Sequence, residues 1–205
     1  SVVDVLCSKG RSLDVVCEAR LLESNERVRL DLEHAAAAAP MAELLDRVTQ
    51  DGLESPKLFA CTRAAFACMG GLDACQVPSV CAAHLLKTLA FSGLRPSLDS
   101  CAACGGPVAS ADVAGDVYVS FREGGVVCAA CRTQVDATFV PASTVAWMRF
   151  LLGATFAEVV ESGMGLDSAF SVLRFCQEWV REHVGASLKS LNFLFSCGLY
   201  GEGPA

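Results

Sequence analysis

The pattern of hydrophobic and polar positions changes along the chain, and it is strand-like at the start. Residues 2–7 and 13–22 are rich in valine and leucine and flank a polar segment, Ser8-Lys9-Gly10-Arg11, which is typical of a β-hairpin with glycine in the turn. A lone hairpin is only marginally stable in water. We therefore expect these strands to belong to a larger sheet or to borrow a partner.

From Leu30 onward the apolar residues recur at helical spacing. The first stripe follows the i, i+3, i+4, i+7 pattern: Met41, Leu44, Leu45 and Val48. Pro40 is expected to kink this helix or to separate it from the preceding alanines. Ser55-Pro56 predicts the start of a second helix, and Pro78 begins a third that closes near Gly93. These segments predict a small helical bundle.

Helical signals return after residue 136. They are a start at Pro141, a capping box of Thr155 and Glu158, a cap at Asp167 or Ser168, and a last amphipathic segment at 187–195. These helices have no separate core of sufficient size, so we expect them to pack on the first bundle. The predicted fold is mainly α, a helical bundle interrupted by a different module.

That module is framed by two CxxC pairs, Cys101 with Cys104 and Cys128 with Cys131. The spacing lets both thiolates of a pair point at one ion, so two pairs predict a tetrahedral four-cysteine zinc site. Residues 117–121 and 126–127 read as the two strands of a zinc ribbon. All four ligands are cysteine, which favours one structural Zn²⁺ per chain. Iron in a rubredoxin-like electron-transfer role and a redox-active disulfide pair remain alternatives.

The remaining titratable residues predict no enzyme. The three histidines are isolated along the sequence and are interpreted as ordinary helix residues: His34, His84 and His183. The aspartates and glutamates are interpreted as residues on solvent-exposed surfaces. No nucleophile motif or phosphate-binding glycine loop is present. Eight further cysteines are interpreted mostly as small buried hydrophobes: Cys7, Cys17, Cys61, Cys68, Cys75, Cys81, Cys176 and Cys197.

Composition narrows the class of protein. Hydrophobic residues make up 53% and charged residues 19% of the 205 residues, which excludes intrinsic disorder. Charged residues interrupt every apolar run well before the length of about 20 residues that a membrane span needs. No signal peptide is expected, so a cytoplasmic location is predicted. The formal net charge of −7, without a basic stripe, gives no indication of nucleic-acid binding.

The order of these elements, together with four segments, resembles the bacterial DNA repair and recombination protein RecO family. The segments are Gly10–Asp14 with Glu18–Leu22, Leu86 through Pro96 to Cys101, the two CxxC pairs, and Leu188–Leu191 with Phe193-Leu194. The resemblance implies that the hairpin is the end of an N-terminal OB-fold whose greater part is absent here. The implied organisation is the OB-fold end (1–25), the helical domain (26–99 and 137–197), the zinc ribbon (100–136) and a tail (198–205).

The resemblance also implies a function. Family members are recombination mediators that act with RecR, and in some pathways RecF, to exchange single-strand-binding protein (SSB) for the recombinase and to anneal single-stranded DNA. Because their DNA binding is attributed largely to the barrel, this chain would supply mainly the protein-interaction and zinc-binding part, in the cytoplasm and at the nucleoid. Lys9 and Arg11 are candidates for phosphate contacts, with a solvated turn as the alternative.

Family members bind the acidic, Phe-ended tail of SSB through their helical domain. Recognition of such a tail needs an apolar pocket and a cation for the carboxylate. The candidate cations are Lys57, Arg63, Lys87 and Arg95, each of which could also be an ordinary solvated residue. Two other classes of protein stay open: a stand-alone zinc-ribbon scaffold without DNA function, and a metal-dependent redox protein.

Overall fold

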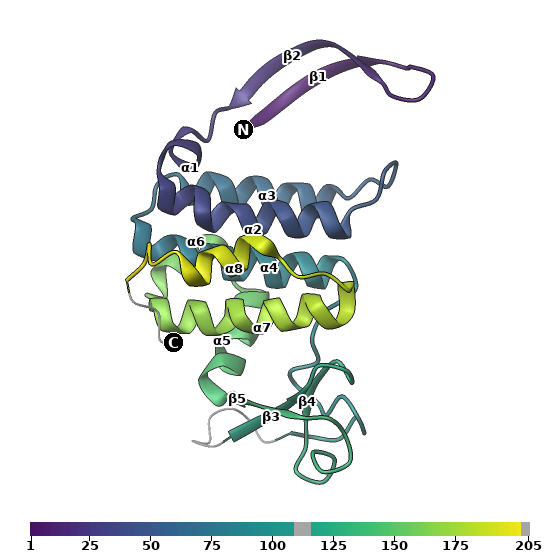
Figure 1. Ribbon diagram of the computed structural model, residues 1–205, viewed down its shortest axis with the longest axis vertical. Coiled ribbons are helices and arrows are strands. Elements are labelled where there is room, and N and C mark those ends of the chain that lie inside the picture. The colour runs from purple at the N-terminus through teal and green to yellow at the C-terminus, as the bar shows by residue number, and fades with distance from the viewer. Residues whose placement is uncertain (109–115, 202–205) are drawn as a thin grey trace.

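The computed structural model describes residues 1–108 and 116–201, and it stacks layers of helices between two small β-sheets (Figure 1). Strands β1 (Val2–Ser8) and β2 (Val15–Glu23) form the hairpin at one end. At the other end, β3 (Asp116–Ser120) pairs with β4 (Gly125–Val127) and β5 (Thr138–Pro141). Residues 109–115 of the predicted ribbon and 202–205 of the predicted tail lie outside the described residues.

Eight α-helices lie within the described part of the chain. Before the three-stranded sheet these are α1 (Glu26–Leu30), α2 (Leu32–Val48), α3 (Pro56–Met69) and α4 (Val77–Phe91), the last preceded by a short 3₁₀ turn (Ala74–Gln76). After it come α5 (Ala142–Gly153), α6 (Phe156–Glu161), α7 (Leu166–Val184) and α8 (Lys189–Ser196). The described part of the chain is thus mostly helical and contains only small sheets, which confirms the predicted mainly-α class.

Helix α4 lies at the centre of the core and contacts α2, α3, α5, α6 and α7. All residues from 77 to 86 are buried, and Lys87 is the one charged residue of this helix, as expected for a helix enclosed by others. Helices from both parts of the sequence share this core, since α7 packs on α4 and α8 packs on α2. The expectation that the later helices pack on the first bundle is therefore confirmed.

Three local predictions differ from the structure. The split expected at Pro40 is wrong: helix α2 runs through this buried residue, because packing against α4 and α8 outweighs the loss of one backbone hydrogen bond. Helix α7 begins at Leu166 after an N-cap at Gly165, slightly before the predicted caps. Strand β5 was not predicted, since a four-residue strand is defined only by its pairing with β3.

The cysteine and histidine predictions have mixed outcomes. Of the eight cysteines outside the cluster, only Cys81 and Cys176 are buried, and Cys61, Cys68 and Cys197 are partly buried. Cys7, Cys17 and Cys75 are exposed, so the expectation is wrong for these three, of which two lie on the exposed hairpin. All three histidines lie in helices, as expected. His84 is buried with Nε2 3.0 Å from Thr62 Oγ1, and desolvation lowers its pKa to about 4, so the ring is neutral.

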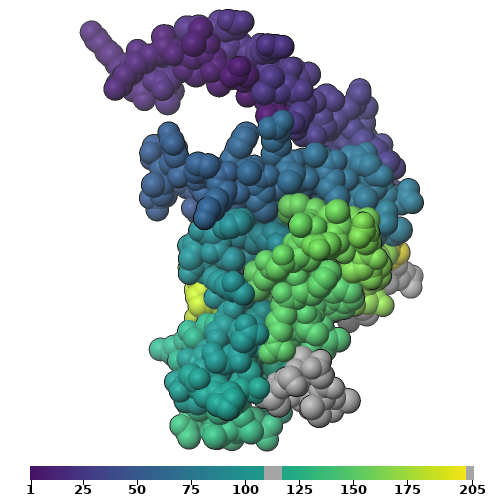
Figure 2. Space-filling model, turned by 180° about the vertical axis from the view of Figure 1, so that it is seen from behind, coloured from purple at the N-terminus to yellow at the C-terminus, as the bar shows by residue number. Residues whose placement is uncertain are grey.

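The hairpin lies apart from the helices, with open space beneath it in both whole-molecule views (Figures 1 and 2). Its valines and leucines other than Val2 are exposed, up to 81% for Leu13. Near its base, the guanidinium of Arg63 on α3 forms an ion pair with Glu23. None of the described helices is both long enough and apolar enough to cross a membrane.

Candidate metal centre

The first cysteine pair lies on a tight turn after α4. The amide of Cys101 donates to the carbonyl of Gly106 at 2.8 Å, and the amide of Gly105 donates back to the carbonyl of Cys101 at 2.8 Å. Gly105 has a φ of +72°, a left-handed conformation that favours glycine. A Cβ on Gly106 would lie 3.3 Å from Cys104 Sγ, so glycine here also leaves room for the sulfur.

The second cysteine pair begins where β4 ends. The amides of Cys131 and Arg132 both donate to the carbonyl of Cys128, at 3.1 and 3.0 Å, and close a second turn. The two turns are held together by Ser97, just before the first pair. Its carbonyl accepts from the Val126 amide of β4 at 2.8 Å, and its amide donates to the Gly124 carbonyl at 2.9 Å. A Cβ on Gly125 would come within 2.1 Å of the Ser97 carbonyl oxygen, so this close approach requires glycine.

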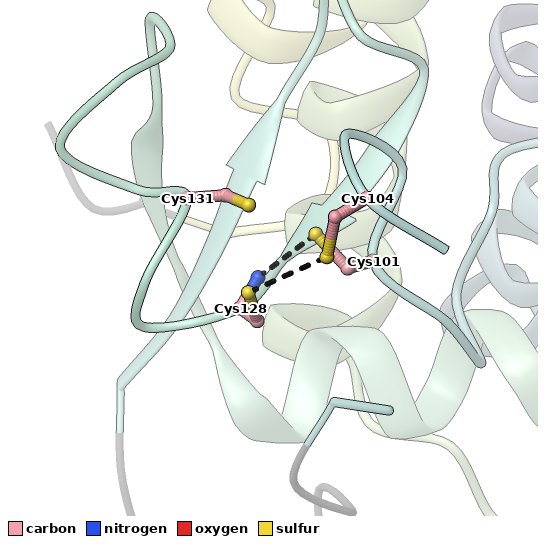
Figure 3. A group of neighbouring side chains, drawn as sticks. All are labelled: Cys101, Cys104, Cys128 and Cys131. Carbon is pink, nitrogen blue, oxygen red and sulfur yellow. Dashed lines mark hydrogen bonds between the residues drawn. The ribbon is translucent and has the colours of Figure 1, made fainter. Parts of the chain in front are cut away.

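These two turns bring all four cysteine sulfurs within 4.8 Å of one another (Figure 3). The Sγ atoms of Cys104 and Cys128 are 3.9 Å apart, and the Cys128 amide donates to Cys101 Sγ at 3.3 Å. Four thiolates about 2.3 Å from a zinc ion lie about 3.8 Å from each other in a tetrahedron. The observed spacing fits a metal ion of this size with only small movements of the side chains.

The backbone around the cluster favours thiolates. Burial raises the pKa of Cys101, but amide hydrogen bonds from Cys128, Cys104 and Ala103 outweigh this effect and lower the pKa to about 6. Hydrogen bonding to the thiols of Cys128 and Cys104 raises the pKa of Cys131 to about 12. Protons must therefore leave the cluster when a cation binds, which makes metal binding dependent on pH.

The donor set limits the chemistry of this centre. Four thiolates suit zinc or iron and leave no coordination position for a substrate. Cys101 is only 2% exposed and Cys104 is exposed, so the cluster lies at the surface with one side against the protein. Such a centre can join the two turns and stabilise the small sheet behind them.

The other predicted site residues lie in different environments. Lys9 and Arg11 are exposed in the hairpin turn, and Lys57 is exposed in the first turn of α3. Arg95 is exposed in the loop after α4. Arg63 is exposed as well, so three of the four cations predicted for tail binding are accessible to solvent.

The remaining two predicted cations have partners within the protein. The Arg63 guanidinium is paired with Glu23. The Lys87 ammonium is half-buried and donates to the Leu152 carbonyl at 3.2 Å, and desolvation lowers its pKa. This hydrogen bond joins α4 to the last turn of α5.

Three residues that the sequence pattern did not single out surround the second cysteine turn: Tyr118, Arg132 and Arg149. The guanidinium carbon of Arg132 lies 4.7 Å from the centre of the Tyr118 ring. Arg149 on α5 donates to the Leu98 carbonyl and lies 3.1 Å from an Asp99 carboxylate oxygen. Only the fold brings these residues together, although the position of Arg132 directly after Cys131 was a visible signal.

Comparison with known protein families identifies the wider context of this site. The family model described as "Recombination protein O C terminal" matches residues 29–192, which include the whole four-cysteine site. The chain belongs to the RecO family. This finding confirms the resemblance to that family.

Individual RecO proteins match nearly the whole chain. The DNA repair protein RecO of Desulfitobacterium hafniense (strain DSM 10664 / DCB-2) is 31% identical over 206 residues, which cover 98% of this chain and 73% of the relative. The DNA repair protein RecO of Rubrobacter xylanophilus is 33% identical over 187 residues, covering 90% of this chain and 70% of the relative. The RecO family, and with it DNA repair, is therefore the context of this chain.

Proposed function

We propose that this chain acts as a non-catalytic mediator of homologous recombination, which works with RecR and SSB to load the recombinase and to anneal single-stranded DNA. The observation that carries the proposal is the match of nearly the whole chain to DNA repair proteins of the RecO family. The proposed location is the cytoplasm, in association with the nucleoid. The chain would contribute mainly protein contacts and a metal-stabilised module.

The metal in this proposal is one structural Zn²⁺ held by Cys101, Cys104, Cys128 and Cys131. The four sulfurs lie within 4.8 Å and offer no open position, which supports a structural role. Four thiolates and one Zn²⁺ carry a net charge of about −2. The centre itself would therefore supply no positive charge for a DNA phosphate.

The hairpin is proposed to be the end of an OB-fold, with Lys9 and Arg11 near DNA phosphates when the barrel is complete. Its exposed valines and leucines support this idea, because an apolar strand pair is normally covered by further strands. The proposed organisation keeps 1–25 as the barrel end, 26–99 and 137–197 as one helical domain, and 100–136 as the ribbon.

The SSB tail is the partner that is simplest to test. A tail ending in phenylalanine needs an apolar surface for the ring and a cation for the carboxylate. Lys57 and Arg95 are exposed, whereas Arg63 and Lys87 already have partners. We therefore rank Lys57 and Arg95 first among the four predicted cations.

The test is fluorescence anisotropy with a labelled SSB tail peptide, and a peptide without the final phenylalanine is the control. We expect micromolar binding that is lost with the phenylalanine and weakened several-fold by Lys57→Gln or Arg95→Gln. Loss of one charged hydrogen bond accounts for that magnitude. If folded, zinc-loaded protein binds neither peptide, the chain is a zinc-stabilised scaffold instead, which is the second candidate function.

A further inference from the structure

A hollow of about 400 Å³ lies beside the metal centre, between the small sheet and α5. Its apolar wall is formed by valines of β3, β4 and α5: Val117, Val126, Val127 and Val145. Two arginines and one tyrosine, Arg132, Arg149 and Tyr118, also line it. The volume is within the range of pockets that bind small molecules or single nucleotides, which is about 300–1,000 Å³.

Arg132 and Tyr118 form a cation–π pair in this hollow. The guanidinium lies over the ring, 4.7 Å from its centre, and Arg132 is exposed to solvent. Among the described side chains, no carboxylate lies within ion-pair distance of Arg132. The guanidinium therefore keeps N–H groups for an anion while its plane remains suited to stacking.

Arg149 is the second arginine of the hollow, and its side chain is held in place by two partners. Its side chain is 27% exposed, and its guanidinium is held by the Leu98 carbonyl and by the carboxylate of Asp99. Because Asp99 offsets much of its positive charge, Arg149 serves mainly to shape the wall. The anion-binding capacity of the hollow comes chiefly from Arg132.

We propose that this hollow binds one nucleotide of single-stranded DNA, with the base stacked beside Tyr118 and Arg132 and the phosphate bonded to Arg132. Stacking on aromatic and guanidinium planes is a usual way to hold an unpaired base. An apolar peptide segment would leave the Arg132 charge without a partner, and for this reason we favour a nucleotide. This inference rests on the proposed function and adds a DNA contact outside the hairpin.

The electrostatics predict a weak contact. The chain carries a formal charge of −7, and a zinc-loaded cluster would add negative charge next to the hollow. For one phosphate contact on a single strand, the logarithm of the binding constant falls against the logarithm of the salt concentration with a slope of only about −0.7. Binding should therefore be measured at low salt, where this contribution is largest.

The experiment uses the full, zinc-loaded chain and a short labelled oligothymidylate. Arg132→Gln removes the charge in the hollow, and Arg122→Gln removes the same charge from the exposed turn between β3 and β4, where Arg122 does not line this hollow. We expect Arg132→Gln to weaken binding about tenfold and Arg122→Gln to change it less than twofold. Equal effects of the two substitutions would overturn the proposal.

A second measurement locates the DNA directly. An oligonucleotide that contains 4-thiothymidine is cross-linked to the wild-type protein, and the modified peptide is identified by mass spectrometry. We expect cross-links in the peptide that contains Tyr118, and competition by unlabelled oligonucleotide. Cross-links only in the hairpin, or no oligonucleotide binding at all, would overturn the hollow as a site. The SSB-tail assay uses no DNA, so it tests the proposed function independently.

Discussion

Glu43 on α2 shows how a single residue joins two distant parts of the chain. Its carboxylate accepts hydrogen bonds from the amides of Lys189 and Ser190, both at 2.9 Å, and from the Ser190 hydroxyl. These amides are at the N-terminus of α8, where a negative charge is stabilising. Partial burial raises the pKa of Glu43, but the Ser190 and Lys189 hydrogen bonds outweigh it, so the pKa is below its ordinary value.

Replacing Glu43 should therefore destabilise the fold in a pH-dependent way. We expect Glu43→Gln to lower the free energy of unfolding at pH 7 by about 1 kcal/mol, as for loss of a helix cap. Because the folded-state pKa is lowered, the stabilisation is present above the unfolded glutamate pKa of about 4.3 and is lost as the pH falls through the folded value. Urea unfolding at pH 7 and in acid measures both effects.

The control for Glu43 is Asp46→Asn, which removes an exposed carboxylate from the same helix. It should change the free energy of unfolding by less than about 0.5 kcal/mol. Equal losses for the two variants at pH 7 would contradict the capping role. If the Glu43→Gln variant stays less stable than the Asp46→Asn variant by the same amount in acid, the stabilisation does not come from the charge of Glu43.

At the scale of elements, the two cysteine turns and the β4-β3-β5 sheet form a small unit. Its stability depends on packing against α5 and on the metal ion. β3 and β4 share only three residue pairs, and the sheet contacts the helices mainly through α5. Short strands of this kind gain little stability from pairing alone. Four metal–sulfur bonds would join the turns more strongly than the hydrogen bonds between them.

The prediction for this unit concerns its metal. Purified protein should be colourless and contain one zinc ion per chain, and Cys101→Ser should lose the zinc and lower the thermal unfolding temperature. Cys75→Ser is the matched control, because Cys75 is exposed and lies outside the cluster. Metal analysis and thermal unfolding measure the two properties. A red-brown preparation would indicate iron, and unchanged zinc content in Cys101→Ser would contradict the assigned ligands.

At the scale of the whole molecule, the chain divides into a packed body and an exposed hairpin. The body has one core shared by helices from both halves of the sequence. Nearly every hairpin residue is exposed. Its base is tied to the helices by the Arg63–Glu23 pair and by the hydrogen bond that Arg29 of α1 donates to the Ser24 carbonyl. Local unfolding should therefore begin in the hairpin.

Limited digestion with trypsin tests this division. We expect the first cuts after Lys9 and Arg11 in the hairpin turn, while the helical body stays intact and keeps its far-UV circular dichroism. The double variant Lys9→Gln, Arg11→Gln should delay these cuts without changing the stability of the body. Early cleavage within α2 or α4 would show that the hairpin is not the least stable part.

The local sequence pattern determined most of the elements and the metal-site candidates. Helix stripes, the Ser55-Pro56 start and the Thr155–Glu158 capping box depend on residues within a few positions of each other. The CxxC spacing is equally local, so the sequence alone predicts all four cysteines of the cluster.

Tertiary structure decided the features that depend on distant partners. Strand β5 exists through its pairing with β3, and α2 stays continuous at Pro40 because it is packed on α4 and α8. Glu43 caps α8 through Lys189 and Ser190, which follow it by 146 and 147 positions in the sequence. The hollow beside the cysteines is lined by side chains from both the ribbon and α5. Neighbouring residues set local conformation, whereas burial and long-range contacts arise only when the folded chain brings separate segments together.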